Sequence, residues 1–357
     1  MNLNSPYLLS DHKKITKFNW LDRNKRQSIT SQIGQKLLII YSPCVSRLGW
    51  LQGWLDVLSA RKIKPTLYSL TNEPTWDDLV RCTELLVPNS RIWGIGGGSV
   101  MDLAKLSTVP LRECSKKMDF LRPKKLNQQH RLWLFPTHYS SSAYVSSSAT
   151  VIRGNCKISG LGLKAEKIFI DPQVLNSIPQ EPWINGAIDT VSHFVEILCS
   201  TSPLNALRFM ALEGWWKDFM NALNSKDFES LFSLSIYLYG DLFPLHSVSW
   251  PIHHLAHDLG PKLGFNHGRI LKLLLPLFLE ARLQNSNLQP CHHLLQEVSN
   301  WIGVISDFRI SEKDYDSVWD SHLWEEHSWY DSSEIEEISY KEYVQNALNR
   351  LLKEVGC

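Results

Sequence analysis

Hydrophobic positions in the first half of the chain form short runs separated by stretches with helical spacing. Leu37–Tyr41 is an apolar run bounded by polar residues, which is typical of a buried strand in a parallel sheet. The further predicted strands are 65–70, 91–95, 132–135 and 167–170, and helical patterns cover 47–58 and about 76–86. Strands that alternate with helices predict an α/β fold with a parallel sheet.

Beyond about residue 179 the apolar positions recur with long helical periods instead. These patterns cover 187–199, 206–223, 231–242 and 270–283. We therefore expect two domains, an α/β domain over 1–178 and an all-helical domain over 179–357. The Trp-rich segment that contains Trp319, Trp324 and Trp329 is expected to place aromatic anchors on the helical domain.

A glycine-rich turn, Gly96–Ser99, lies between the strand 91–95 and a predicted helix. Glycines let a phosphate approach backbone amides, and a helix N-terminus adds unpaired N–H groups and a positive dipole end. Ser99 and Asp102 also have the spacing of a helix capping pair. A tight turn without any ligand shows the same pattern, so both interpretations stay open. A polar loop, 136–148, follows the next strand. It is expected either to face the same crevice or, without its partner, to be a solvated, flexible loop.

Carboxylate and imidazole side chains recur at a four-residue spacing in the second half. Asp189 and His193 would share one helix face, His253 and His257 repeat the spacing, and His267 follows between glycines. One carboxylate with three imidazoles suits Fe(II), Zn(II) or Mn(II). A surface ion pair or a polar helix start would explain each piece alone. Together the pieces favour a metal site.

Composition and charge narrow the class of protein. Lys and Arg number 37 against 36 Asp and Glu, which excludes the broad basic surface of a nucleic-acid-binding protein. The most apolar stretch, 270–279, carries Lys272 and Pro276 and is too short to span a membrane. The seven cysteines show no Cys-x-x-Cys spacing, and no signal peptide is recognisable. We expect a cytoplasmic protein that acts on a small molecule, with no nucleic-acid or membrane partner.

These motifs resemble the iron-dependent (group III) alcohol dehydrogenase family, of the dehydroquinate synthase-like superfamily. The resemblance runs in order from about residue 36 to 285. The matching segments are Gly96–Lys105, Ile168–Pro172, Gly186–Glu196, His253–Gly260 and His267–Gly268, which look like the family's GGGSxxDxAK turn, interdomain strand, GxDAxxHxxE helix, and HxxxHxLG and HG segments. The family implies a dinucleotide-binding N-terminal domain, a helical C-terminal domain and a divalent metal.

Residue by residue, the resemblance implies the site. Its metal ligands would be Asp189, His193, His253 and His267. Glycerol dehydrogenases of the superfamily usually lack the match to His193, which favours Fe(II), with Zn(II) or Mn(II) as alternatives. His257 matches a histidine beside the nicotinamide and is the expected catalytic residue. The residues expected to hold NAD(H) or NADP(H) are Gly96, Gly97, Gly98, Ser99, Asp102, Thr137, Lys157 and Ser42.

Three departures from the family pattern matter. The PTTxGTGSE loop appears as Pro136–Tyr144, with serines at the glycine positions and Tyr144 in place of glutamate. Ser42 replaces an acidic residue that would repel a 2′-phosphate, so NADP(H) becomes admissible. The usual C-terminal Asn-Pro-Arg segment is missing, and the chain length and Trp-containing tail resemble the branch that includes 3-deoxy-octulosonate 8-oxidase.

We therefore expect a metal-dependent, NAD(P)-linked alcohol dehydrogenase or aldehyde reductase that acts on a small polar or sugar-derived substrate. A homodimer is expected, as in other families of this kind. Two alternatives stay open. One is a lyase or cyclase that resembles dehydroquinate synthase, and the other is a non-catalytic relative, which the altered serine loop and missing C-terminal segment motivate.

Overall fold

The structure is a computed structural model. It describes residues 15–17, 23–34, 36–109, 111, 130–140, 142–154, 156–171, 174, 176–199, 206–240, 252–253, 255–257, 260, 266–283 and 291–305. The chain divides into two compact units: unit 1 comprises 1–186 and 215–244, and unit 2 comprises 187–214 and 245–357. The Trp-rich segment with Trp319, Trp324 and Trp329 lies outside the described residues.

Unit 1 is built on a six-stranded parallel sheet with the strand order β1-β8-β5-β4-β2-β3. Its strands are β1 (Ile15–Lys17), β2 (Leu37–Tyr41), β3 (Thr66–Ser69), β4 (Arg91–Gly96), β5 (Arg131–Pro136) and β8 (Lys167–Ile170). The apolar runs predicted the five strands other than β1, and all six residues of the central strand β4 are buried. The parallel sheet of the predicted fold class is therefore confirmed.

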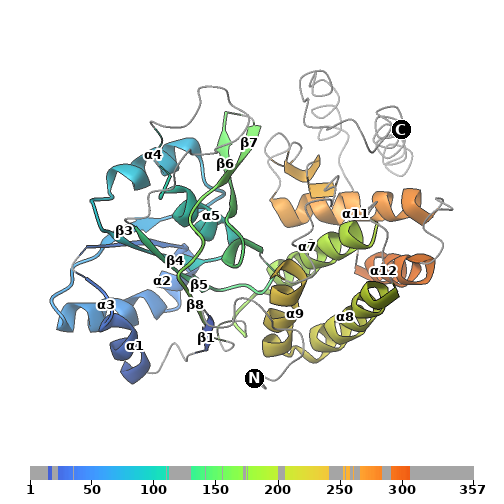
Figure 1. The fold of residues 1–357 in the computed structure, drawn as a ribbon, viewed down its shortest axis with the longest axis horizontal. Helices are drawn as coiled ribbons and strands as arrows, with labels where there is room; N and C mark the ends of the chain where they lie inside the picture. Colours follow the sequence, from blue (N-terminus) through green and yellow to red (C-terminus); the bar gives the residue numbers. More distant parts are fainter. Residues whose placement is uncertain are drawn as a thin grey trace. The chain divides into compact units, whose positions relative to one another are not determined.

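Helices cover both faces of this sheet (Figure 1). Alternate residues of β4 point to opposite faces. Trp93 packs edge-on against Trp54 of α3 (Trp50–Ala60), in a core that also contains Phe135. On the other face, a Cβ placed on Gly94 would lie 3.1 Å from the Ala104 side chain of α5 (Gly98–Leu106). One face of β4 thus packs aromatic side chains against α3, and the other face leaves no room for a side chain at Gly94.

Two further helices and a hairpin of unit 1 pack against α3 and α5. A helix, α1 (Arg23–Thr30), contacts α3, and another, α4 (Trp76–Glu84), contacts α5. An antiparallel hairpin, β6 (Ser148–Arg153) with β7 (Cys156–Leu161), packs against α5. The sequence analysis did not predict this hairpin, although the alternation of buried and more exposed residues along β6 is typical of a half-buried strand.

Beyond residue 179 the described secondary-structure elements are helices, as predicted. The helices are α7 (Gln180–Leu198), α8 (Ala206–Ser225), α9 (Phe228–Gly240), α11 (His267–Leu283) and α12 (His292–Ile305). The division between the two units falls inside α7 and inside α8. The domain boundary at residue 178 stays a prediction. Within the described helices, none combines the length and the apolar character that a membrane span requires.

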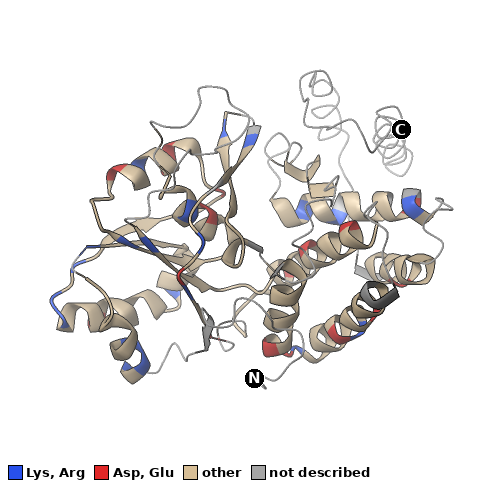
Figure 2. Cartoon of the chain, in the orientation of Figure 1, with Lys and Arg blue, Asp and Glu red and all other residues tan. Residues whose placement is uncertain are grey.

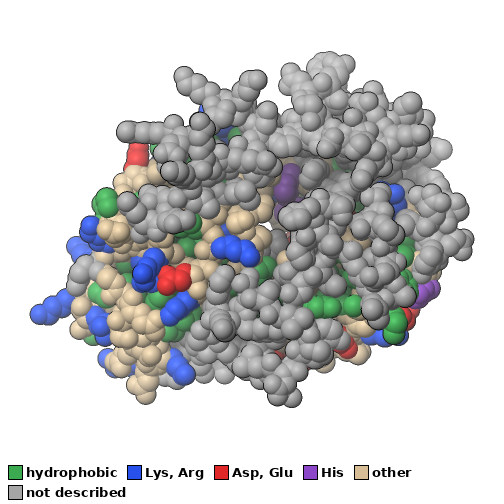
Figure 3. Space-filling view, viewed as in Figure 1, with side chains coloured by type: hydrophobic (Ala, Val, Ile, Leu, Met, Phe, Trp, Pro, Cys, Tyr) green, Lys and Arg blue, Asp and Glu red, His purple; other side chains and the backbone are tan. Residues whose placement is uncertain are grey.

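Charged residues are distributed over the elements of both units (Figure 2). In the coloured part of the surface in Figure 3, Lys and Arg side chains are separated by side chains of other types. The free thiols of the described residues are Cys44, Cys82, Cys199 and Cys291.

Candidate active site

One face of α7 carries the acidic and histidine side chains of the predicted metal site. Asp189, His193 and Glu196 stand at positions i, i+4 and i+7, so all three lie along one side of the helix. Pro182 is tolerated because it lies in the first turn, where a backbone N–H has no helical partner. The His193 Nδ1 donates a hydrogen bond to the backbone oxygen of Asp189 at 2.9 Å.

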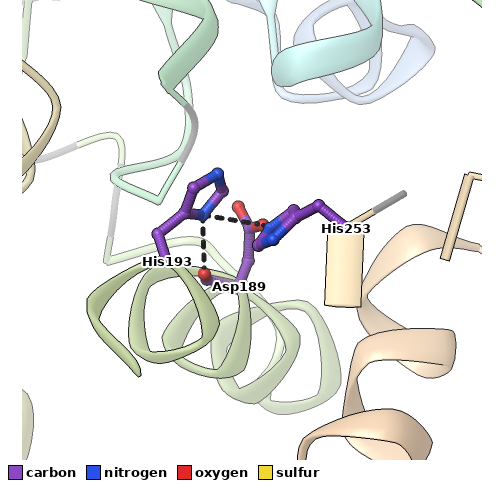
Figure 4. Close-up of side chains that lie close together, drawn as sticks. All are labelled: Asp189, His193 and His253. Atoms are coloured by element: carbon purple, nitrogen blue, oxygen red, sulfur yellow. Dashed lines mark hydrogen bonds and ion pairs between the residues drawn. The ribbon is translucent and has the colours of Figure 1, made fainter. Parts of the chain in front are cut away.

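A second segment brings His253 to this face. Residues 252–253 and 255–257 are helical, and the His253 Nε2 lies 3.4 Å from the Asp189 Oδ1. The rings of His193 and His253 have centroids 3.7 Å apart. In Figure 4 the three side chains converge, two from α7 and one from the 252–257 segment. One potential ligand atom from each of Asp189, His193 and His253 falls within 4.8 Å of the others.

The fourth predicted ligand, His267, is the first residue of α11. The Asn266 Oδ1 accepts a hydrogen bond from the Arg269 backbone N–H at 2.9 Å, so Asn266 caps the helix and fixes where it begins. The His267 Nε2 lies 3.6 Å from the Asp189 Oδ1. The structure therefore brings all four predicted ligands together around one carboxylate.

A residue to which the sequence analysis gave no role, Glu196, supports this cluster from behind. It is buried, and its Oε2 lies 2.5 Å from the His253 Nδ1. Its Oε1 accepts hydrogen bonds from the backbone N–H groups of Ile252, at 2.8 Å, and His253, at 3.2 Å. The spacing of Glu196 on the ligand face of α7 is the sequence signal that could have identified it.

The cluster shifts the ionisation of its own members. Burial opposes ionisation of Asp189, but hydrogen bonds from His253 and His267 outweigh it and hold the pKa of that carboxyl well below its usual range. Burial lowers the pKa of His193 to about 3, and the neighbouring His253 acts in the same direction. Burial also disfavours the cation of His253, but Glu196 raises its pKa to about 9. An ionised Asp189 and a neutral His193 are the forms that bind metals.

The donor set fits a transition metal. One carboxylate and nearby imidazoles are the ligand types that iron and zinc sites use, and the carboxylate behind His253 is typical of metal sites. The His193 Nδ1 is hydrogen-bonded to the Asp189 backbone oxygen. His193 can therefore bind the ion only if the ion replaces this hydrogen bond or the His193 ring turns. The predicted catalytic residue, His257, is half-buried, and its ring centroid lies 5.1 Å from that of His267.

The predicted cofactor turn in unit 1 lies at the carboxyl ends of β2 and β4. The strand order reverses between these strands, and open α/β sheets bind ligands at such a point. The Ser42 N–H donates to the Ile95 oxygen at 3.1 Å, and the Thr137 N–H donates to the Gly96 oxygen at 2.9 Å. These bonds place Ser42 and Thr137 next to the glycine turn. The turn after β4 and the loop after β5, which were expected to share a crevice, therefore begin side by side.

The glycines of this turn differ in what surrounds them. A Cβ on Gly96 would lie 2.7 Å from the Val100 side chain, so packing alone requires this glycine. A Cβ on Gly97 would meet nothing within 4 Å, and its φ of −83° suits any residue. Neither packing nor backbone conformation requires Gly97. Open space at a helix N-terminus fits a dinucleotide phosphate that approaches the backbone.

The expected capping pair does not form. Gly97 is the N-cap of α5, without a side-chain cap, and Ser99 lies in the first turn. The Asp102 Oδ2 instead accepts from the N–H and Oγ1 of Thr150, at 3.1 and 3.0 Å. The Asp102 Oδ1 lies 3.2 Å from the Nζ of Lys105, which is fully buried and also donates to the Ser148 oxygen. Asp102 thereby joins α5 to the β6–β7 hairpin.

Lys157 makes a different contact. It lies on β7, where its Nζ is 2.8 Å from the Glu73 Oε2. This ion pair links the hairpin to the loop after β3. The assignment of Lys157 to a cofactor ribose stays a prediction.

The altered loop after β5 is held by buried hydrogen bonds. The Tyr139 hydroxyl donates to the Trp183 oxygen at 2.9 Å, and the Tyr144 hydroxyl donates to the Tyr139 oxygen at 2.9 Å. The Tyr239 hydroxyl, from α9, donates to the Ser140 oxygen at 2.8 Å. These residues give the loop fixed partners where the family pattern has glycines.

Comparison with known proteins identifies relatives with this fold. Residues 17–172 match the family model described as iron-containing alcohol dehydrogenase. The chain is 26% identical over 227 residues to long-chain-alcohol dehydrogenase 1 of Geobacillus thermodenitrificans, a match that covers 60% of this chain and 56% of that protein. The aligned part thus spans little more than half of that curated relative.

Solved structures share the fold over most of the chain. NADH-dependent butanol dehydrogenase A of Thermotoga maritima superposes with a TM-score of 0.70 at 19% identity and covers 85% of each chain. An iron-containing alcohol dehydrogenase of the same organism gives a TM-score of 0.68 at 19% identity, over 94% of this chain and 98% of that one. The resemblance inferred from the motifs is confirmed: residues 17–172 match the model of the iron-containing alcohol dehydrogenase family, and the chain has the fold of solved iron-containing alcohol dehydrogenases.

Proposed function

We propose that the protein is a metal-dependent alcohol dehydrogenase or aldehyde reductase that transfers a hydride between a nicotinamide cofactor and a small alcohol or carbonyl substrate. The observation that carries the proposal is the convergence of His193, His253 and His267 on the Asp189 carboxylate. The family match ends at residue 172, before these four residues. The proposal for the metal ligands therefore rests on their own geometry and chemistry.

The proposed roles follow from the donor types. Asp189, His193, His253 and His267 would hold Fe(II), with Zn(II) or Mn(II) as alternatives. A bound metal of this kind supplies Lewis acidity to an alcohol or carbonyl oxygen. His257 is half-buried beside His267, so its imidazole can carry a proton between substrate and solvent. The glycine turn would hold the cofactor phosphates through backbone amides.

The finer assignments are part of the same proposal. Ser42 leaves the end of β2 without a carboxylate, which supports NADP(H) as well as NAD(H). The long-chain-alcohol dehydrogenase and butanol dehydrogenase among the relatives support an alcohol or aldehyde as substrate. A sugar-derived substrate of the 3-deoxy-octulosonate type, a homodimer and a cytoplasmic location stay predictions. Asp189 with His193 disfavours the Glu/His/His metal site of a dehydroquinate synthase-like lyase.

The test is metal analysis of freshly purified protein, followed by NADH and NADPH oxidation with a panel of small and sugar-derived aldehydes. We expect close to one iron per chain and turnover with at least one cofactor. His257→Ala should keep the metal but slow turnover. Absence of activity with both cofactors in the presence of bound iron would rule out the dehydrogenase, and phosphate release with transient cofactor reduction would favour the lyase.

A further inference from the structure

We propose that Glu196 is a positioning residue that fixes the His253 ring with its proton on Nδ1 and its Nε2 directed at the ligand cluster. The inference rests on the proposed metal site and extends it to a residue outside the ligand set. It concerns the orientation and the tautomer of one ligand.

Three donors converge on the two carboxylate oxygens of Glu196. The Oε1 accepts from the N–H groups of Ile252 and His253, and the Oε2 lies 2.5 Å from the His253 Nδ1. The side chain is buried, with 1% of the residue exposed. A buried carboxylate is costly unless charge-assisted hydrogen bonds satisfy it, and these three bonds do so. Glu196 thus fixes both the backbone of the 252–253 segment and the ring of His253.

The chemistry of the acceptor determines the tautomer. An ionised carboxylate can only accept hydrogen bonds, so the ring nitrogen that faces it must carry the proton. In a neutral imidazole the other nitrogen then presents its lone pair. For His253 that nitrogen is Nε2, which lies 3.4 Å from the Asp189 Oδ1 and faces the cluster. Without a metal this nitrogen also carries a proton and donates to Asp189, and a metal that binds there displaces that proton while Nδ1 keeps its own. A carboxylate behind a ligating histidine orients the ring and raises its basicity in this way.

The substitution Glu196→Gln separates this role from simple space filling. The glutamine is isosteric, and its amide oxygen would remain with the two backbone N–H donors of Ile252 and His253. Its NH₂ group would then face the His253 Nδ1. Because both the NH₂ group and a protonated Nδ1 are donors, no hydrogen bond can form between them. The ring must present a lone pair at Nδ1 and move its proton to Nε2, which disables Nε2 as a ligand.

The first measurement uses zinc(II) as the probe on the full-length protein. Competition with a chromophoric chelator should show zinc binding about 10- to 100-fold weaker for Glu196→Gln than for the wild type. Glu84→Gln is the matched control, because Glu84 is exposed on α4 and lies outside the cluster. The substitution removes the same negative charge as Glu196→Gln. The control should bind zinc like the wild type. Equal affinities for Glu196→Gln and wild type would overturn the positioning role.

The second measurement is made on the wild type, and His253→Gln serves only to assign the resonance. Nitrogen-15 spectra of the zinc-loaded wild type should show a His253 ring with a proton on Nδ1 and a zinc-shifted Nε2, assigned by its absence from His253→Gln. A proton on Nε2 with zinc at Nδ1 would overturn the inference even if Glu196→Gln bound zinc poorly for other reasons. If the wild type itself bound no zinc or iron, the proposed metal site would fail, and the role of Glu196 with it.

Discussion

The glycine turn of unit 1 and the histidine cluster of unit 2 differ in what makes them chemical sites. The turn offers backbone amides, and the position of Gly97 has open space in front of it. The cluster offers ionisable side chains from three separate segments, drawn around Asp189 and supported by Glu196. A turn of this kind also occurs without a ligand, whereas three imidazoles around a carboxylate need a specific reason to be there. The cluster is the more informative of the two regions.

The largest effect is expected from Asp189→Asn, which removes the shared anionic donor of the cluster. The amide is isosteric, so the fold should be kept, but metal affinity and turnover should fall together. Loss of Lewis-acid catalysis corresponds to about a thousandfold lower rate. Elemental analysis and NAD(P)H oxidation measure both quantities. Asp77→Asn, at an exposed position on α4, is the control and should change neither. Stoichiometric metal in Asp189→Asn would contradict the ligand assignment.

The next largest effect is expected on stability, from the buried ion pair between Asp102 and Lys105 in unit 1. Burial lowers the pKa of Lys105, and Asp102 opposes this shift by its charge. Asp102→Asn would leave the buried ammonium without its counter-charge, and we expect a loss of about 3 kcal/mol in the free energy of unfolding. Urea unfolding near neutral pH without cofactor measures it.

Lys105→Met is the matched variant for this ion pair. It removes the buried charge, and Asp102 keeps its two hydrogen bonds from Thr150. It should therefore cost clearly less than Asp102→Asn. If the two losses were equal, the ion pair would have no specific role in joining α5 to the hairpin.

These residues also show what sequence patterns can and cannot predict. The bounds of β2 and β8 follow from apolar runs, because strands buried on both faces need them. Asp189 and His193 follow from a four-residue helical spacing. The spacing of Ser99 and Asp102 predicted a capping pair that does not form. Asp102 instead accepts hydrogen bonds from Thr150, which lies 48 residues further along the chain and is not visible to a local pattern. The role of Glu196 likewise requires His253, 57 residues away.

The glycine turn itself can be tested with Gly97→Ala. The new Cβ would meet no protein atom within 4 Å, so the free energy of unfolding should change by less than about 0.5 kcal/mol. Cofactor affinity should fall about tenfold, equivalent to 1.4 kcal/mol, because the methyl group occupies the space in front of the amides. Fluorescence titration with NADH and NADPH measures this loss. Unchanged affinity for both would favour a turn without a ligand.

Gly94→Ala provides the opposite control in the same strand. Its Cβ would lie 2.9 Å from the Leu134 side chain and 3.1 Å from Ala104, so the sheet or α5 must move. We expect a loss of about 1–3 kcal/mol in the free energy of unfolding. The two alanine variants thus separate a glycine that packing requires from one that it does not.

The smallest effect concerns the loop after β5, which lies beside the glycine turn through Thr137. Tyr239→Phe removes the hydroxyl that donates to the Ser140 oxygen and leaves a buried carbonyl with one bond fewer. A net loss of about 1 kcal/mol is expected for one such hydrogen bond. Tyr41→Phe, at a half-buried position of β2, measures the cost of removing a tyrosine hydroxyl elsewhere in unit 1. If Tyr239→Phe cost no more than this control, the hydrogen bond from α9 would not hold the loop after β5. The serine-rich loop would then lack the fixed backbone that we propose in place of the family's glycines.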